Sequence, residues 1–117
     1  MASEDAAEEP GREPGAQLDP PRLLGSRDPD TGEVYFPPRR YSVDGRLREC
    51  MPVVLSSAGT LSSHTSLGKR HYGEVDLPDG PRIITELIGE DHQINAAYVV
   101  QVDQAEDGTL SWRFARA

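Results

Sequence analysis

The stretch DPDTGEVYFPPRRYSVDGRLRECMPVVLSSAGT, residues 28–60, decides the fold of this 117-residue chain. It contains two short turn sequences, 28–32 and 41–45, and each ends in a glycine. A glycine at that place favours a backbone with positive φ, which other residues adopt only with strain. The side chains of Asp28 and Asp44 are suited to accept hydrogen bonds from backbone N–H groups inside such turns. The sequence therefore predicts two compact turns that close on their own hydrogen bonds.

The segment between the two turns reads as a short strand that cannot lie at the centre of a sheet. Residues 34–38, VYFPP, begin with β-branched and aromatic residues and end with two prolines. Pro37 and Pro38 fix two φ angles, remove two backbone donors and push the preceding residue towards an extended conformation. A strand with this ending is expected at the edge of a sheet or at its exit.

This arrangement resembles the small zinc-ribbon and OB-fold proteins that accompany thiolases and related acyl-CoA enzymes. Their ribbon reads roughly C-x-x-C-G, an aromatic-Pro-Pro-Arg segment, and a second C-x-x-C-G. The resemblance spans residues 22–115, through the strand at 53–56 and the segment at 72–80. The glycines and the Phe-Pro-Pro-Arg segment match, whereas the four metal positions fall on Asp28, Thr31, Tyr41 and Asp44.

None of those four residues is a cysteine or a histidine, the ligands that structural zinc takes. We therefore expect a ribbon without metal and a chain without a cofactor. Its turns are then held by the aspartates, by the ring of Tyr41 and by a partner surface. The acidic opening at 28–33 also resembles a calcium loop, but Pro29 and the missing acid at the twelfth position disfavour that interpretation.

Composition predicts one small domain with a tail. The chain is 36% hydrophobic and 6% aromatic, which leaves a small core. Residues 1–20 hold six acidic residues and one basic residue, with little to bury, so we expect a disordered acidic tail there. We expect an all-β protein in three parts: the tail at 1–20, a degenerate rubredoxin-like ribbon at 21–49 and an OB-fold barrel at 50–117.

The barrel is predicted from a run of short β-rich segments with no helical pattern between them. Prolines, aspartates and glycines separate the segments at 78–81 and 107–108, where we expect turns. The predicted loop at 68–71 lies between the second and third barrel strands. The predicted strands cover residues 51–57, 60–67, 72–77, 82–88, 97–102 and 109–114.

Several classes of function are disfavoured by the sequence. Cys50, the single cysteine, excludes a disulfide within the chain, and nothing fixes it near His64 or His71 as a nucleophile with its base. With a net charge of −8, the chain has little attraction for nucleic acid. No apolar run reaches the length of a membrane span, so we expect a cytoplasmic protein.

The resemblance implies a non-catalytic accessory subunit that binds and stabilises a thiolase-fold enzyme. That enzyme is expected to be a thiolase, an acyltransferase or a retro-aldol lyase acting on acyl-CoA, assembled with this chain as a heterotetramer around the enzyme's dimer. Two alternatives stay open, a free-standing OB-fold module for acyl-CoA or single-stranded nucleic acid and an enzyme in its own right. Rigid aromatics and arginines suit an interface with an acidic partner or with a CoA phosphate. The predicted partner-binding residues are Tyr35, Phe36, Pro37, Pro38, Arg39, Arg40, Arg46 and Arg48, and the candidate CoA-phosphate contacts are Lys69 and Arg70.

Overall fold

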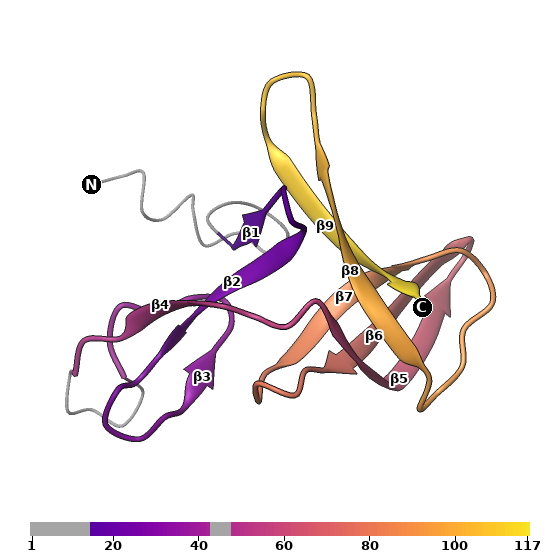
Figure 1. Ribbon diagram of the computed structural model, residues 1–117. Coiled ribbons are helices and arrows are strands. Elements are labelled where there is room, and N and C mark those ends of the chain that lie inside the picture. The colour runs from indigo at the N-terminus through magenta and orange to yellow at the C-terminus, as the bar shows by residue number, and fades with distance from the viewer. Residues whose placement is uncertain (1–14, 43–47) are drawn as a thin grey trace.

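The computed structural model describes residues 15–42 and 48–117, and these residues form nine β-strands and no helix (Figure 1). The predicted all-β class is therefore confirmed. The strands divide into a small N-terminal sheet, which we call the ribbon, and a closed five-stranded barrel. No helix in the described part of the chain is long and apolar enough to cross a membrane. The strands are β1 (Ala16–Gln17), β2 (Arg22–Arg27), β3 (Val34–Tyr35), β4 (Met51–Val54), β5 (Ala58–Leu67), β6 (Arg70–Asp76), β7 (Arg82–Ile88), β8 (Ala97–Gln104) and β9 (Leu110–Arg116).

Strand β2 is the centre of the ribbon, and β1, β3 and β4 all pair with it antiparallel. Its apolar Leu23 is fully buried, together with Leu55 just after β4. Between them, a Cβ on Gly25 would lie 2.5 Å from the carbonyl oxygen of Tyr35. Only glycine allows the backbones to come this close, so Gly25 lets β3 approach the centre of the sheet.

The N-terminal boundary of the ribbon differs from the prediction of a tail over residues 1–20. Ala16 in β1 is buried, and it lies opposite Leu23 of β2. The carbonyl of Gly15 also accepts a hydrogen bond from the N–H of Leu24, at 2.8 Å. Ala16 is thus part of the same buried cluster as Leu23, so residues 16 and 17 belong to the ribbon. Of the predicted tail, residues 1–14 lie outside the described residues.

The strand predicted at 51–57 was expected to open the barrel, and that expectation is wrong. Strand β4 instead pairs with β2, with Val54 opposite Leu24 and Met51 opposite Arg27. β4 pairs with an edge of β2 that would otherwise have open backbone groups. The buried Leu55, whose N–H donates to the carbonyl of Leu23, holds the end of β4 there. The barrel consequently begins at β5, and the predicted 68–71 loop joins its first and second strands.

The barrel closes in the order β5-β6-β7-β9-β8, with β8 returning to β5. All neighbours are antiparallel except β7 and β9, which run parallel. Alternate residues of the strands face inward, as the β pattern of the sequence predicts, except at a register shift between Leu61 and Ser63 of β5. The buried apolar side chains of the barrel are Leu61, Val75, Leu77, Ile83, Leu87, Tyr98, Val100, Leu110, Trp112 and Phe114.

The ribbon and the barrel are joined by an aromatic contact. The ring of Phe36, just after β3, meets the ring of Trp112 in β9 edge to face, with centroids 5.5 Å apart. Trp112 in turn lies at right angles to the ring of Phe114 in the barrel core. Edge-to-face pairs of this kind add to the stabilisation that buried area provides. Phe36 therefore fixes the ribbon against the barrel wall.

Candidate partner-binding surface

An ion pair connects the two halves of the ribbon at the place where the family pattern has metal ligands. Nη2 of Arg48 lies 2.6 Å from Oδ2 of Asp28, and its Nε lies 3.2 Å from both carboxylate oxygens. The side chain of Asp28 is 1% exposed and that of Arg48 is 19% exposed. The hydrogen bond from Arg48 holds the pKa of Asp28 far below its ordinary value, although burial acts the other way. The carboxylate is therefore ionised, as an ion pair in this position requires.

The first turn has the structure that the sequence predicts. Oδ1 of Asp28 accepts a hydrogen bond from the N–H of Asp30 at 2.9 Å, and its carbonyl accepts one from the N–H of Gly32 at 2.8 Å. Gly32 has φ of 78°, the left-handed conformation expected there. Asp28 thus closes the first turn through its own hydrogen bonds, in addition to its ion pair with Arg48.

The second turn is described only at its two ends. The N–H of Ser42 donates to the carbonyl of Arg48 at 2.9 Å, and Tyr41 forms an antiparallel bridge with Glu49. Its predicted residues Asp44, Gly45 and Arg46 lie outside the described residues. The described ends already bring residue 48 back beside the first turn.

The residues at the described metal positions do not fit zinc. Asp28 is occupied by Arg48, Thr31 is exposed, and Tyr41 presents only a phenol. Within residues 15–42 and 48–117, no group of three or more histidine, cysteine, aspartate or glutamate side chains is placed to hold a metal ion. Tyr41 was also expected to hold the turns, but its ring is 43% exposed and lies under the guanidinium of Arg40, 5.9 Å away. Arg48 has the structural role that we had assigned to Tyr41.

The predicted partner-binding residues divide between structural and exposed positions. Phe36 is half-buried against Trp112, and Arg48 is engaged by Asp28. Arg39 and Arg40 are exposed, as an interface requires. The sequence could not separate these two groups, because exposure depends on which side of the ribbon meets the barrel.

The exposed group forms a hollow of about 250 Å³, lined by Pro38, Arg39, Arg40 and Tyr41. The backbone of the hollow is held by strand β2, because the N–H of Arg39 donates to Oγ of the buried Ser26 at 2.7 Å. The guanidinium of Arg39 lies over the ring of Tyr35 at 5.6 Å, and its Nε donates to the carbonyl of Tyr41 at 3.2 Å. Two cations and two rings thus lie together on a backbone that is hydrogen-bonded to Ser26.

Lys69 and Arg70 lie far from this hollow. Lys69 is in the turn between β5 and β6 and Arg70 begins β6, and Figure 1 shows this turn at the opposite end of the molecule from β3 and β4. Both side chains are exposed, and a hydrogen bond with Tyr72 raises the pKa of Arg70 above its ordinary value. The structure therefore does not bring these two residues together with the ribbon arginines.

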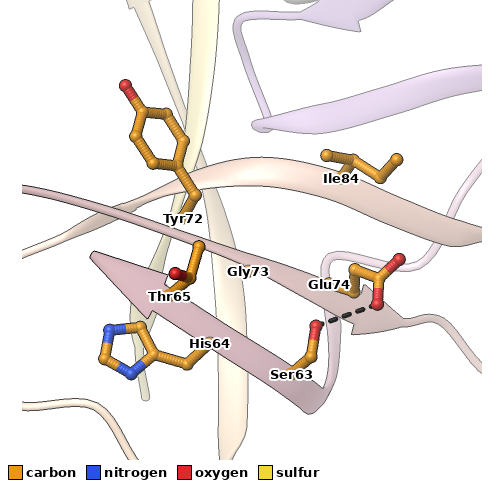
Figure 2. A pocket seen from close by; sticks show the side chains of 7 residues that line it. All are labelled: Ser63, His64, Thr65, Tyr72, Gly73, Glu74 and Ile84. Atoms are coloured by element: carbon orange, nitrogen blue, oxygen red, sulfur yellow. Dashed lines mark hydrogen bonds between the residues drawn. The ribbon is translucent and has the colours of Figure 1, made fainter. Parts of the chain in front are cut away.

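A second hollow, of about 310 Å³, lies on the barrel wall over β5, β6 and β7. Tyr72 and Ile84 rise from neighbouring strands beside it, and Glu74 is bonded to the hydroxyl of Ser63 at 2.8 Å (Figure 2). Ile84 is 75% exposed, so the hollow is open to solvent. Its lining is Ser63, His64, Thr65, Tyr72, Gly73, Glu74 and Ile84.

The thiol of Cys50 is not part of a catalytic arrangement with either predicted histidine. Burial raises the pKa of Cys50, and the nearby charge of Asp28 raises it further, so the thiol form is favoured. His64 and His71 lie on barrel strands and bond to each other at 2.9 Å. A nucleophile and base need direct contact, and these groups do not have it.

Comparison with known proteins agrees with the geometry. Residues 16–42 match the family model described as ChsH2, rubredoxin-like zinc ribbon domain. That match confirms the rubredoxin-like ribbon and the resemblance that the sequence indicated. A solved structure titled Ltp2-ChsH2(DUF35) aldolase is similar, with a TM-score of 0.67 and 18% identity, over 81% of this chain and 84% of that one. No curated protein sequence matches the chain.

Proposed function

We propose that this chain is a non-catalytic accessory subunit of a thiolase-fold enzyme that acts on acyl-CoA substrates. The observation that carries the proposal is the shared fold: ribbon and barrel together match most of a chain from a structure titled as an aldolase that contains ChsH2. The partner supplies the nucleophile and the base, and this chain supplies surface and stabilises the partner. We propose a heterotetramer built around the partner's dimer, in the cytoplasm.

The docking surface in this proposal is the hollow of residues 38–41, with Tyr35 beside it. Two exposed arginines on a backbone held by Ser26 are suited to carboxylates of a partner, because guanidinium groups bind carboxylates in a fixed geometry. Phe36 and Arg48 act indirectly, by holding the ribbon in shape. Lys69 and Arg70, at the other end of the molecule, are proposed contacts for a CoA phosphate bound in the complex.

Co-expression with a thiolase-fold enzyme encoded beside this chain tests the proposal. We expect the two proteins to co-purify. In the R39E/R40E variant we expect the affinity for the partner enzyme to fall at least about tenfold. The variant K69E/R70E carries the same charge change on the barrel, and it should keep the partner while weakening acyl-CoA binding by the complex. A chain that captures no such enzyme, or whose capture is unaffected by R39E/R40E, contradicts the proposal.

The alternative, a free-standing OB-fold module, is favoured by the second hollow. That hollow is apolar along Ile84 and the ring of Tyr72, and Arg70 bonds to Tyr72 at its edge, so an acyl chain and a phosphate have complementary groups there. Calorimetric titration of the isolated chain with acyl-CoA and with a single-stranded oligonucleotide separates the two functions. Binding of either ligand without a partner supports the alternative.

A further inference from the structure

All three histidines of the chain meet on one side of the barrel. Their ring centroids are 5.2 Å apart for His64 and His71, 5.1 Å for His64 and His92, and 5.0 Å for His71 and His92. Nε2 of His64 and Nδ1 of His71 share a hydrogen bond of 2.9 Å. Three titratable rings are thus in mutual contact although they come from β5, from β6 and from the connection between β7 and β8.

Two of the rings lie on the core side of their strands. His71 alternates with Gly73 and Val75 of β6, which are both buried, and His64 lies directly opposite Gly73 on β5. Residues opposite each other in an antiparallel pair share a face of the sheet. The histidines therefore form a polar end to the barrel core, where His64 is exposed to solvent and His71 and His92 are half-buried.

The hydrogen bonds around His92 fit its neutral form. Its Nε2 lies 2.9 Å from the carbonyl of Gly89, so Nε2 carries the proton, and Nδ1 accepts from the hydroxyl of Tyr98 at 3.0 Å. The oxygen of Tyr98 accepts in turn from the N–H of Gln93 at 3.1 Å. Tyr98 is fully buried. A proton on Nδ1 of His92 would therefore leave the buried hydroxyl proton of Tyr98 without its acceptor.

This network holds the connection between β7 and β8, which runs along the barrel beside β5 (Figure 1). Strand β8 pairs with β5 only at residues 58–60. Beyond that point β5 bonds to the β7–β8 connection instead. The N–H of Asn95 donates to the carbonyl of Leu61 at 2.8 Å, and the N–H of Leu61 donates to the carbonyl of Ala96 at 3.1 Å. Asn95 and Ala96, at the end of the segment 89–96, thus pair with β5 where β8 does not reach it.

In the part of the chain that the structure describes, no carboxylate is hydrogen-bonded or ion-paired to the three imidazoles. From β7, the residue opposite His71 is the apolar Leu87, and β8 contributes Tyr98. On the connection itself, Asp91 is paired with Arg116 of β9 at 3.2 Å. Among the described residues, the three imidazoles bond and stack only with one another, Tyr98 and Gly89; the remaining charged groups nearby in the chain are Arg70, Glu86 and Glu90.

We propose that the three histidines and Tyr98 form a proton-operated latch, which holds segment 89–96 against β5 at neutral pH and releases it in mild acid. Protonation turns Nδ1 of His92 from an acceptor into a donor and places charge next to two further imidazoles. Both changes oppose the closed arrangement, and neither opposes the open one, where water solvates each ring.

The direction of the effect agrees with the lowered pKa of His64. Burial lowers the pKa of His64 from its ordinary value of 6.5, and the neighbouring His92 and His71 lower it further. The open chain therefore takes up this proton at higher pH than the closed one. The stability that the neutral cluster contributes is present above about pH 6.5 and is lost as the pH falls below it.

Amide hydrogen exchange of the full chain, measured with chelator present at pH 7.5 and pH 5.0, tests the latch. We expect the protection factors of Gln93 and Asn95 to fall at least about tenfold more than that of Val100, whose N–H donates to the carbonyl of Ser57 elsewhere in the barrel. The variant Tyr98→Phe removes only the hydroxyl, and it should show weak protection of the segment at both pH values. If Tyr98→Phe does not fold, His92→Ala on the half-buried connection serves the same purpose.

The proposal is overturned if the protection of Gln93 and Asn95 is unchanged between the two pH values in the unmodified chain. It is also overturned if the segment of the His92→Ala variant is as protected at pH 7.5 as that of the unmodified chain. A nitrogen-detected NMR spectrum that finds the proton of neutral His92 on Nδ1 contradicts it directly, since the latch requires that proton on Nε2.

Discussion

Nη2 of Arg48 lies 2.6 Å from Oδ2 of Asp28, and this ion pair joins two segments that are twenty residues apart. Asp28 occupies the first metal position of the ribbon pattern, and it also caps its own turn through the N–H of Asp30. A metal would join the two turns through four ligands. Here the guanidinium of Arg48, which follows the second turn, binds the carboxylate of Asp28 in the first turn.

Replacing Arg48 tests the structural role of this ion pair. In the Arg48→Ala variant the buried carboxylate of Asp28 loses its counter-charge, so we expect the melting temperature to fall by at least about 5 °C. Arg48→Lys should recover only part of the loss, because an ammonium cannot bind both carboxylate oxygens in the same geometry. Thermal unfolding followed by circular dichroism measures both variants. Arg27→Ala, which removes an exposed arginine of β2, is the matched control and should leave the melting temperature nearly unchanged.

The stability of the ribbon should depend on pH through Asp28. Its pKa is lowered in the folded chain by the hydrogen bond from Arg48, so the ion pair contributes fully above the ordinary aspartate value of 3.8 and is lost as the pH falls below it. We expect denaturant titrations to show stability decreasing from about pH 4 downwards. The slope should be shallower in Asp28→Asn. Equal slopes in the two proteins would mean that other carboxylates cause the acid sensitivity.

Phe36 is predicted to couple the ribbon to the barrel. Phe36→Ala removes the edge-to-face contact with Trp112 at 5.5 Å, and we expect a loss of about 2 kcal/mol in the free energy of unfolding, less than for a fully buried phenylalanine. The emission of Trp112, the one tryptophan, should shift to the red because water reaches its ring. Phe36→Leu should retain most of the stability. Unchanged emission in Phe36→Ala would place Phe36 away from Trp112 in solution.

Gly73 is predicted to be irreplaceable in the barrel wall. A Cβ there would lie 2.5 Å from the carbonyl oxygen of Ser63 and 2.8 Å from a methyl carbon of Leu61. Gly73→Ala must therefore push β5 and β6 apart, at a cost of about 1–3 kcal/mol in the free energy of unfolding. Ser66→Ala, on the exposed end of β5, is the control and should be nearly neutral. A stable Gly73→Ala variant would show that the strands separate more easily than their pairing indicates.

The sequence predicted the elements whose signals are local. The turn at Asp28 follows from an aspartate and a glycine at fixed spacing, and the barrel strands follow from β-rich runs between turn residues. Gly80 and Gly108 adopt positive φ in the turns that were predicted around them. In each case the residues that form the structure are neighbours in the chain.

Features that depend on distant contacts could not be predicted in the same way. Arg48 is predicted at an interface because its partner, Asp28, is twenty residues away in the first turn, and no local pattern links the two residues. Strand β4 was assigned to the barrel because its sequence suits either sheet, and only the free edge of β2 decides between them. The histidine cluster brings together His64, His71 and His92, whose separations follow no motif; the pairing of β5 with β6 and the course of the β7–β8 connection make them neighbours.

Thermal unfolding of the isolated chain, with added zinc and with added chelator, tests most directly whether an ion pair stands in place of a metal. We expect the same melting temperature in excess chelator and in equimolar zinc, and no stoichiometric zinc in the purified protein. A melting temperature that falls when chelator is added, together with one zinc ion per chain, would contradict it.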